Sequence, residues 1–177
     1  MTQTKTIKIF LASSEELRME RLTITEMEMV LNNVLRKRGI QIEVEKWEHL
    51  DSSMGIKHKQ EEYNDVLCEC DICLALFWTK FGDYTKEEFE VAYNEMIAGR
   101  NPQKLYVLFK DAEKLTSELE NFKSSFAVKY RHSYNRFNNA DMLKLHFVKM
   151  IEDFVNPDTP FLTIENGYTT IDDTIEL

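Results

Sequence analysis

The chain has 177 residues, of which 43% are apolar and 30% charged, and its formal net charge is −9. This length and apolar content suit one ordinary domain with a substantial core, stable without disulfides or metals. The acidic charge argues against nucleic acid as a direct partner, because phosphate binding depends largely on Lys and Arg.

Short apolar runs alternate with helical patterns from the start of the chain. Residues 6–12 predict a strand, and residues 15–38 predict a helix that Gly39 ends after a basic last turn. Residues 40–47 alternate apolar and polar side chains, as expected of a strand near a sheet edge. Residues 57–68 predict a second helix.

The next element is the most apolar of the chain. Residues 72–78 form a nearly continuous apolar run, which favours a central parallel strand covered on both faces. Residues 81–83 break this run. We predict that Thr85 is the N-cap of a third helix, which has acidic residues in its first turn. The Asn101-Pro102 pair is predicted to end that helix.

The remaining elements continue the alternation. We predict a buried strand at residues 105–109, a helix at 111–126, a short fifth strand at 128–134 and an amphipathic helix at 140–155. The last segment, 156–177, shows no convincing periodicity, so we interpret it as a linker or tail.

This alternation predicts an α/β fold of the flavodoxin-like type over residues 1–155. It is a three-layer sandwich with about five parallel strands in the order 2-1-3-4-5 and helices on both faces. In such a fold ligands bind at the carboxyl ends of strands 1 and 3. That crevice would receive Ser13 and Ser14, the 51–55 loop, and residues 78–88.

The cysteines and histidines give no metal signal. Cys68, Cys70 and Cys73 are spaced by one and two residues without a fourth ligand nearby, so we expect reduced, partly buried thiols. There is no secretory pattern, and no apolar run approaches the roughly 20 residues that span a bilayer. We therefore expect a soluble, cytoplasmic protein without a metal site or membrane contact.

An ordered set of motifs resembles a known family. The set is similar to the TIR-like domain at the N-terminus of bacterial STAND NTPases and antiphage defence proteins, a divergent relative of Toll/interleukin-1 receptor domains. It spans roughly residues 6–155. The motifs are IFLASSEEL (9–17), Glu20-Arg21, EKWEHLDSSMG (45–55), QEEYN (60–64), CDICLALFWTKFGDYTKEEFEVA (70–92) and RHSYN (131–135).

The resemblance implies a function and site residues. Many TIR domains cleave NAD, with a catalytic glutamate in the first turn of the helix after the third strand, and Glu88 fits that pattern. An aromatic residue four positions earlier often lines the same pocket, which points to Tyr84. Ser13 and Ser14 match a loop that contacts the nucleotide, and Trp47 matches a mobile segment beside the pocket.

The chemistry of the implied reaction is compatible with a single carboxylate. Cleavage of the nicotinamide–ribose bond builds positive charge on the ribose, and nicotinamide leaves without needing a proton. Glu88 could therefore stabilise the transition state electrostatically. Tyr84 or Trp78 would stack on nicotinamide. NAD would be the substrate, with no resident cofactor, and self-association or a sensor or STAND NTPase partner would activate the domain.

Alternatives remain open from the sequence. Glu90 is the rival carboxylate, Trp78 could belong to the core, and Ser13 and Ser14 could cap the first helix instead of binding a nucleotide. Two further functions compete with NAD cleavage: a non-catalytic TIR-type adaptor that only mediates assembly, and a nucleoside deoxyribosyltransferase-like enzyme.

Overall fold

Five parallel strands form the central sheet, in the order β2-β1-β3-β4-β5. The computed structural model describes residues 4–46, 59–82, 84–156, 162–165 and 168–171. The predicted flavodoxin-like α/β fold and its strand order are confirmed. The strands are β1 (Lys5–Ser13), β2 (Ile40–Glu45), β3 (Ile72–Phe77), β4 (Lys104–Lys110) and β5 (Asn135–Phe137).

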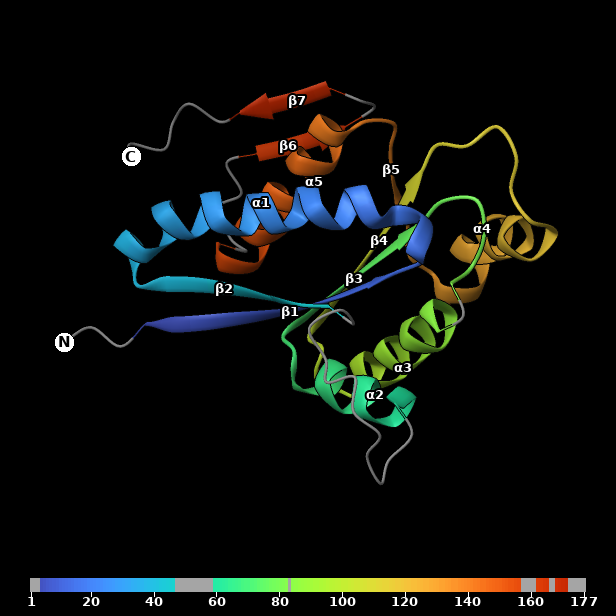
Figure 1. Cartoon of the computed structure of the whole chain (residues 1–177), viewed down its shortest axis with the longest axis horizontal. Helices are drawn as coiled ribbons and strands as arrows, with labels where there is room; N and C mark the ends of the chain where they lie inside the picture. Colours follow the sequence, from blue (N-terminus) through green and yellow to red (C-terminus); the bar gives the residue numbers. More distant parts are fainter. Residues whose placement is uncertain (1–3, 47–58, 83, 157–161, 166–167, 172–177) are drawn as a thin grey trace.

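Helices cover both faces of the sheet (Figure 1). On one face lie α1 (Arg18–Leu35) and α5 (Ala140–Val155), and on the other lie α2 (Lys59–Glu69), α3 (Thr85–Ile97) and α4 (Ser117–Tyr130). None of the helices in the described part of the chain is long and apolar enough to cross a membrane.

Strand β3 lies at the centre of the sheet, and all six of its residues are buried. Because successive strand residues point to opposite faces, Ile72, Leu74 and Leu76 pack on the α1 and α5 side, whereas Cys73, Ala75 and Phe77 pack on the other side. Phe77 contacts an aromatic cluster from α3, α4, β4 and the loop after β3, namely Phe81, Phe89, Phe109 and Phe122. This cluster fixes the start of α3 against the end of β3.

Several boundaries differ from the sequence-based expectations. The helix predicted at 111–126 is α4, which begins only at Ser117, and α3 ends at Ile97, before the Asn101-Pro102 pair. The fifth strand is not at 128–134, because α4 continues to Tyr130 and the strand forms at 135–137. Arg131, with a φ of 54°, separates the two elements. Thr85 is the first residue of α3 and not its N-cap; Tyr84 takes that position without a side-chain capping bond. The Thr85 side chain is buried against the preceding loop at Gly82.

The segment after α5 contains more structure than we expected. Strands β6 (Leu162–Glu165) and β7 (Tyr168–Ile171) pair antiparallel within residues 156–177, where the sequence pattern predicts a linker or tail. Strand β6 contacts α5, on the side away from the sheet (Figure 1). Strands of four residues are too short for a clear alternating pattern.

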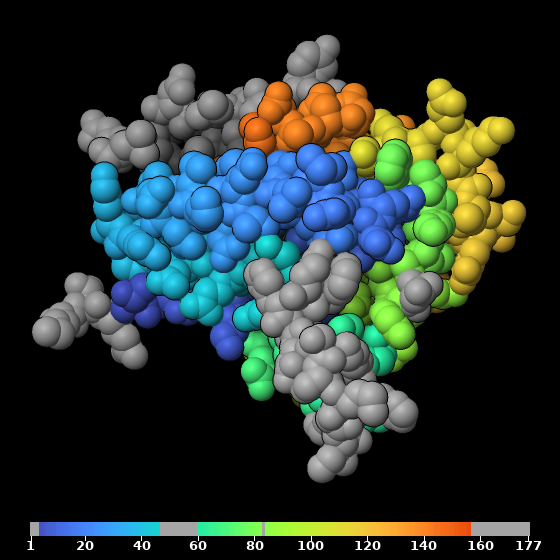
Figure 2. Space-filling view, in the orientation of Figure 1, coloured from blue at the N-terminus to red at the C-terminus, as the bar shows by residue number. Residues whose placement is uncertain are grey.

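Helix α1 has apolar residues on its outer face as well as its inner one. In Figure 2 this helix extends across the surface of the view shown, in blue. Because apolar side chains occur on both faces of α1, helical spacing predicts the helix but does not show which of its faces is buried. The exposed apolar side chains on α1 are Met19, Leu22, Met29, Val30 and Val34.

Candidate active site

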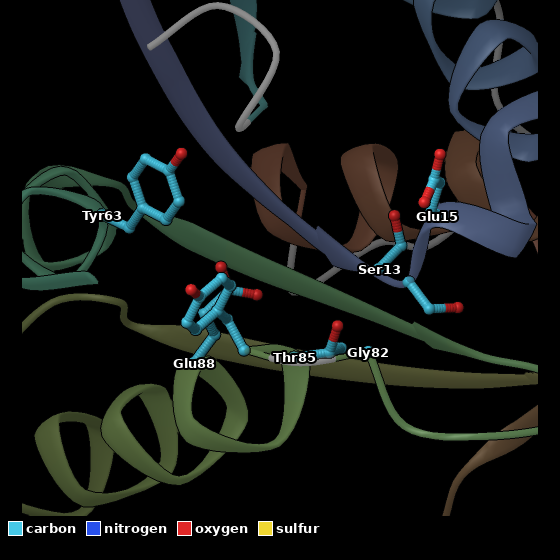
Figure 3. A pocket seen from close by; sticks show the side chains of 8 residues that line it. Ser13, Glu15, Tyr63, Gly82, Thr85 and Glu88 are labelled. Atoms are coloured by element: carbon cyan, nitrogen blue, oxygen red, sulfur yellow. The ribbon is translucent and has the colours of Figure 1, made fainter. Parts of the chain in front are cut away.

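A cavity of about 270 Å³ opens at the carboxyl ends of β1 and β3. This is the position where parallel α/β sheets bind ligands. Figure 3 shows Tyr63 of α2 on one side of the cavity and Ser13 and Glu15 on the other, with Glu88 and Thr85 of α3 between them. The lining residues are Ser13, Ser14, Glu15, Tyr63, Gly82, Tyr84, Thr85 and Glu88.

The serines at the end of β1 are held by a buried arginine. Arg21 Nη1 of α1 donates to Ser13 Oγ at 3.2 Å and to the Ser14 carbonyl at 2.7 Å. Ser14 precedes the 3₁₀ turn η1 (Glu15–Leu17) but forms no side-chain capping bond with it. Ser14 thus occupies the N-cap position of this turn without a side-chain capping bond, and both serines lie at the cavity wall.

Glu16 ties the loop after β1 to the loop after β3. Its carboxylate accepts hydrogen bonds from the backbone N–H groups of Thr79 at 3.0 Å and Lys80 at 3.3 Å. It also accepts from Thr79 Oγ1 at 2.5 Å and from Ser14 Oγ at 3.2 Å. The two loops that form the rim of the cavity are thus connected by a single side chain.

The two loops also approach each other closely at Gly82. A Cβ atom at this position would lie 2.5 Å from Thr85 Oγ1 and 2.9 Å from the Ser14 Cα atom. Any residue other than glycine would push the loop after β3 away from β1. Gly82 is therefore needed for the present shape of the cavity.

Glu88 is the buried carboxylate of the site. Its exposed fraction is 5%, and no hydrogen bond or ion pair to its carboxylate occurs among the described residues. Burial, with a smaller contribution from the charge of Glu87, raises the pKa of Glu88 to about 7. A buried ionisable group without a partner is rare in a folded protein, and it is a feature of functional sites.

Glu90 has the opposite environment. Its carboxylate accepts hydrogen bonds from the Tyr130 hydroxyl at 2.6 Å and from Lys129 Nζ at 3.0 Å, both on α4. These bonds outweigh burial and lower the pKa of Glu90. Glu90 does not line the cavity. The structure thus separates the two carboxylates that the sequence left as rivals.

Two tyrosines complete the wall. Tyr84, a predicted site residue, is 52% exposed at the start of α3 and lines the cavity. Tyr63 of α2 is buried, and burial together with the nearby charge of Glu88 raises the pKa of its hydroxyl. We assigned Tyr63 no role from the sequence, although it lies within the QEEYN motif of the resemblance. Its spacing with Val66 and Leu67 resembled that of a core residue.

Of the two predicted tryptophans, Trp78 lies within the described residues. Trp78 does not line the cavity; its indole N–H donates to the Asp111 carbonyl at 3.2 Å, and Lys110 Nζ lies 3.8 Å from its ring centroid. Trp78 also packs against the apolar cluster on the α1 side, which matches the core alternative. Trp47 and the 51–55 loop lie outside the described residues.

The described part of the chain contains no cluster of three or more His, Cys, Asp or Glu that could hold a metal ion. Cys70 and Cys73 are buried free thiols, and burial is the main cause of their raised pKa values. His146 is also buried, with Nε2 3.0 Å from the Arg136 carbonyl oxygen.

Comparison with models of protein families finds no match, and comparison with curated protein sequences finds none either.

Proposed function

We propose that this protein cleaves the nicotinamide–ribose bond of NAD, as an NAD glycohydrolase of the TIR-like type, with Glu88 as the catalytic carboxylate. The observation that carries the proposal is the buried, unpartnered carboxylate of Glu88 in a cavity at the carboxyl ends of β1 and β3. The TIR-like motif around Glu88 supports the same assignment.

The proposed reaction needs one negative charge close to the ribose. As the C1′–N bond breaks, its electron pair moves to the nicotinamide nitrogen and positive charge develops on the ribose ring. An ionised Glu88 stabilises that charge, and the low polarity of its surroundings strengthens the interaction. Water then adds to C1′ and releases a proton, giving nicotinamide and ADP-ribose, or an internal nucleophile gives a cyclic product.

Other cavity residues would position the substrate. Ser13 and Ser14 present hydroxyls at the end of β1 that can bond the ribose or its neighbours. The rings of Tyr84 and Tyr63 offer stacking faces for nicotinamide. Trp78 is outside the cavity lining, so the stacking role is assigned to the tyrosines.

The cellular part of the proposal follows from the resemblance. The protein would act in the cytoplasm in bacterial immune defence, without binding nucleic acid directly. Self-association through TIR-like surfaces would activate it, with a sensor or STAND NTPase as the partner that brings several copies together.

Release of nicotinamide from NAD tests the proposal. The protein is assayed alone and artificially clustered, together with Glu88→Ala and Glu90→Ala, which remove carboxylates two positions apart. We expect clustered wild type to release nicotinamide, Glu88→Ala to lose about 100-fold or more of the rate, and folded Glu90→Ala to keep it.

Other results would contradict the proposal in distinct ways. Absence of release from the clustered protein would favour the adaptor function. Release of bases from neutral nucleosides without NAD cleavage would favour the deoxyribosyltransferase-like function. Loss of activity only in Glu90→Ala would show that the wrong carboxylate had been assigned.

A further inference from the structure

The walls of the cavity beside Glu88 carry negative charge and hydroxyl groups. The carboxylates of Glu15 and Glu88 line it, together with the hydroxyls of two serines, one threonine and two tyrosines. Among the described residues, no Lys or Arg belongs to the lining. The Arg21 guanidinium is nearby, but it is buried and donates to Ser13 and to the Ser14 carbonyl. Such walls attract a cation and repel a pyrophosphate.

The size of the cavity also bears on which part of NAD binds in it. Its volume of about 270 Å³ lies just below the range of about 300–1,000 Å³ typical of small-molecule pockets. NAD consists of two nucleotides joined by a pyrophosphate, and its nicotinamide riboside part is roughly half of the molecule. That part carries the positive charge of NAD on the pyridinium ring. Size and charge are therefore both compatible with recognition of this half of the substrate.

We infer that the site recognises the cationic N-ribosyl pyridinium part of its substrate without needing the phosphates, and that it also cleaves the free nucleoside nicotinamide riboside. The inference rests on the proposed function and names its substrate class. In the reaction the C1′–N bond breaks and its electron pair neutralises the pyridinium. Water adds to C1′, and the products are nicotinamide, ribose and one proton, with no further co-reactant.

The electrostatic environment of Glu88 agrees with this selection. Its pKa is raised to about 7 by burial and by Glu87, so a cation bound beside it would favour the ionised carboxylate. Binding would then release a proton, and affinity for the cationic nucleoside would rise with pH through neutrality. Among the described residues, the titratable groups that line the cavity with Glu88 are Glu15 after β1, Tyr63 on α2 and Tyr84. Glu87 on α3 and Cys73 on β3 also interact with Glu88 electrostatically.

The experiment compares nicotinamide riboside with NAD in the same clustered preparation. Nicotinamide release gives kcat/KM for both substrates. Titration calorimetry compares binding of nicotinamide riboside with that of its uncharged dihydro form. The variants are Glu88→Gln, Glu15→Gln in the cavity wall, and Glu26→Gln, which removes the same charge from an exposed position of α1 outside the cavity lining.

We expect kcat/KM for nicotinamide riboside to lie within about tenfold of that for NAD. The charged nucleoside should bind at least about fivefold more tightly than the dihydro form. Glu15→Gln should reduce this preference and Glu26→Gln should leave it unchanged. Cleavage of NAD with nicotinamide riboside about 100-fold or more slower would overturn the inference and leave the proposed function standing.

The binding measurement separates the two failures. If neither substrate is cleaved, but the charge preference is present and depends on Glu15 and Glu88, then the recognition part is supported and the catalytic proposal fails. If there is neither cleavage nor a charge preference, the inference is overturned as well.

Discussion

Glu88 and Glu90 lie two residues apart on α3, yet only Glu88 faces the cavity, while Glu90 is bound by Tyr130 and Lys129 of α4. Each residue of an α-helix is rotated by about 100° from the one before it, so side chains two positions apart point in directions about 160° apart. They therefore do not face each other. The Glu88 carboxylate therefore has no partner among the described residues at the carboxyl ends of β1 and β3, whereas the Glu90 carboxylate connects α3 to α4.

The first prediction concerns stability and Glu88. The pKa of this group lies near 7 in the folded protein against 4.5 for an ordinary glutamate. The folded state then binds more protons than the unfolded state between these values, so stability falls as pH rises from about 4.5 to about 7. At about 1.4 kcal/mol per pH unit, the full cost reaches about 3 kcal/mol at pH 8.

Glu88→Gln removes this cost. We expect the variant to exceed wild type in free energy of unfolding at pH 8 by up to about 3 kcal/mol, and to match it near pH 4. Urea unfolding at both pH values measures the difference, with Glu26→Gln as the exposed control. A Glu88→Gln variant less stable than wild type at pH 8 would show that the carboxylate has a stabilising partner.

The second prediction concerns Glu90. Glu90→Ala leaves the buried Tyr130 hydroxyl without its acceptor, which should lower the free energy of unfolding by about 1–3 kcal/mol at neutral pH. The pKa of Glu90 is lowered, so this stabilisation is present above the pKa of an ordinary glutamate and lost as pH falls below it. Thermal unfolding at neutral and acid pH checks both points. An equal effect at both pH values would contradict the assigned role.

The third prediction concerns the close approach at Gly82. The added methyl of Gly82→Ala would meet Thr85 Oγ1 and the Ser14 backbone, so the loop after β3 must move. We expect Gly82→Ala to lower the free energy of unfolding by about 1–3 kcal/mol. We also expect it to change the KM for NAD more than the matched Gly99→Ala variant does. Gly99 has a positive φ of 74° and open space around its Cα, so its substitution strains the backbone away from the cavity. Unchanged KM in Gly82→Ala would mean that the loop position does not shape the site.

The fourth prediction concerns the Glu16 connection between the two loops. Glu16→Ala leaves the N–H groups of Thr79 and Lys80 without their acceptor. We expect faster hydrogen exchange of these two amides and of Gly82, with β3 itself remaining protected. Exchange measured by mass spectrometry or NMR tests this. Uniformly faster exchange across β3 would indicate general destabilisation instead of a released loop.

The sequence predicted the fold well where apolar runs were long. Strand β3 is an unbroken run of buried residues, and α5 begins and ends where its periodicity does. Strand β5 was misplaced because it has only three residues, and residues 128–130 prolong α4. Short elements depend on tertiary contacts more than on their own pattern.

The site was predictable in part, because several of its residues lie at or after the ends of strands. Ser13 is the last residue of β1, and Ser14, Tyr84 and Glu88 follow the ends of β1 and β3. Strand order alone therefore brings them to one edge of the sheet. Tyr63 comes from α2, and its orientation depends on how that helix packs. For Trp78 the sequence left two alternatives, the cavity and the core, and the structure places its ring beside Lys110, outside the cavity lining.

The pH dependence of kcat/KM for NAD tests the central claim most directly, because this parameter reports the ionisation of the free enzyme. For the clustered protein, we predict a rise of about tenfold per pH unit below neutrality and a plateau above a midpoint near 7, where Glu88 ionises. Glu90→Ala should show the same profile. A rate independent of pH between 5 and 9, or the same profile in Glu88→Gln, would contradict the assignment of Glu88 as the catalytic carboxylate.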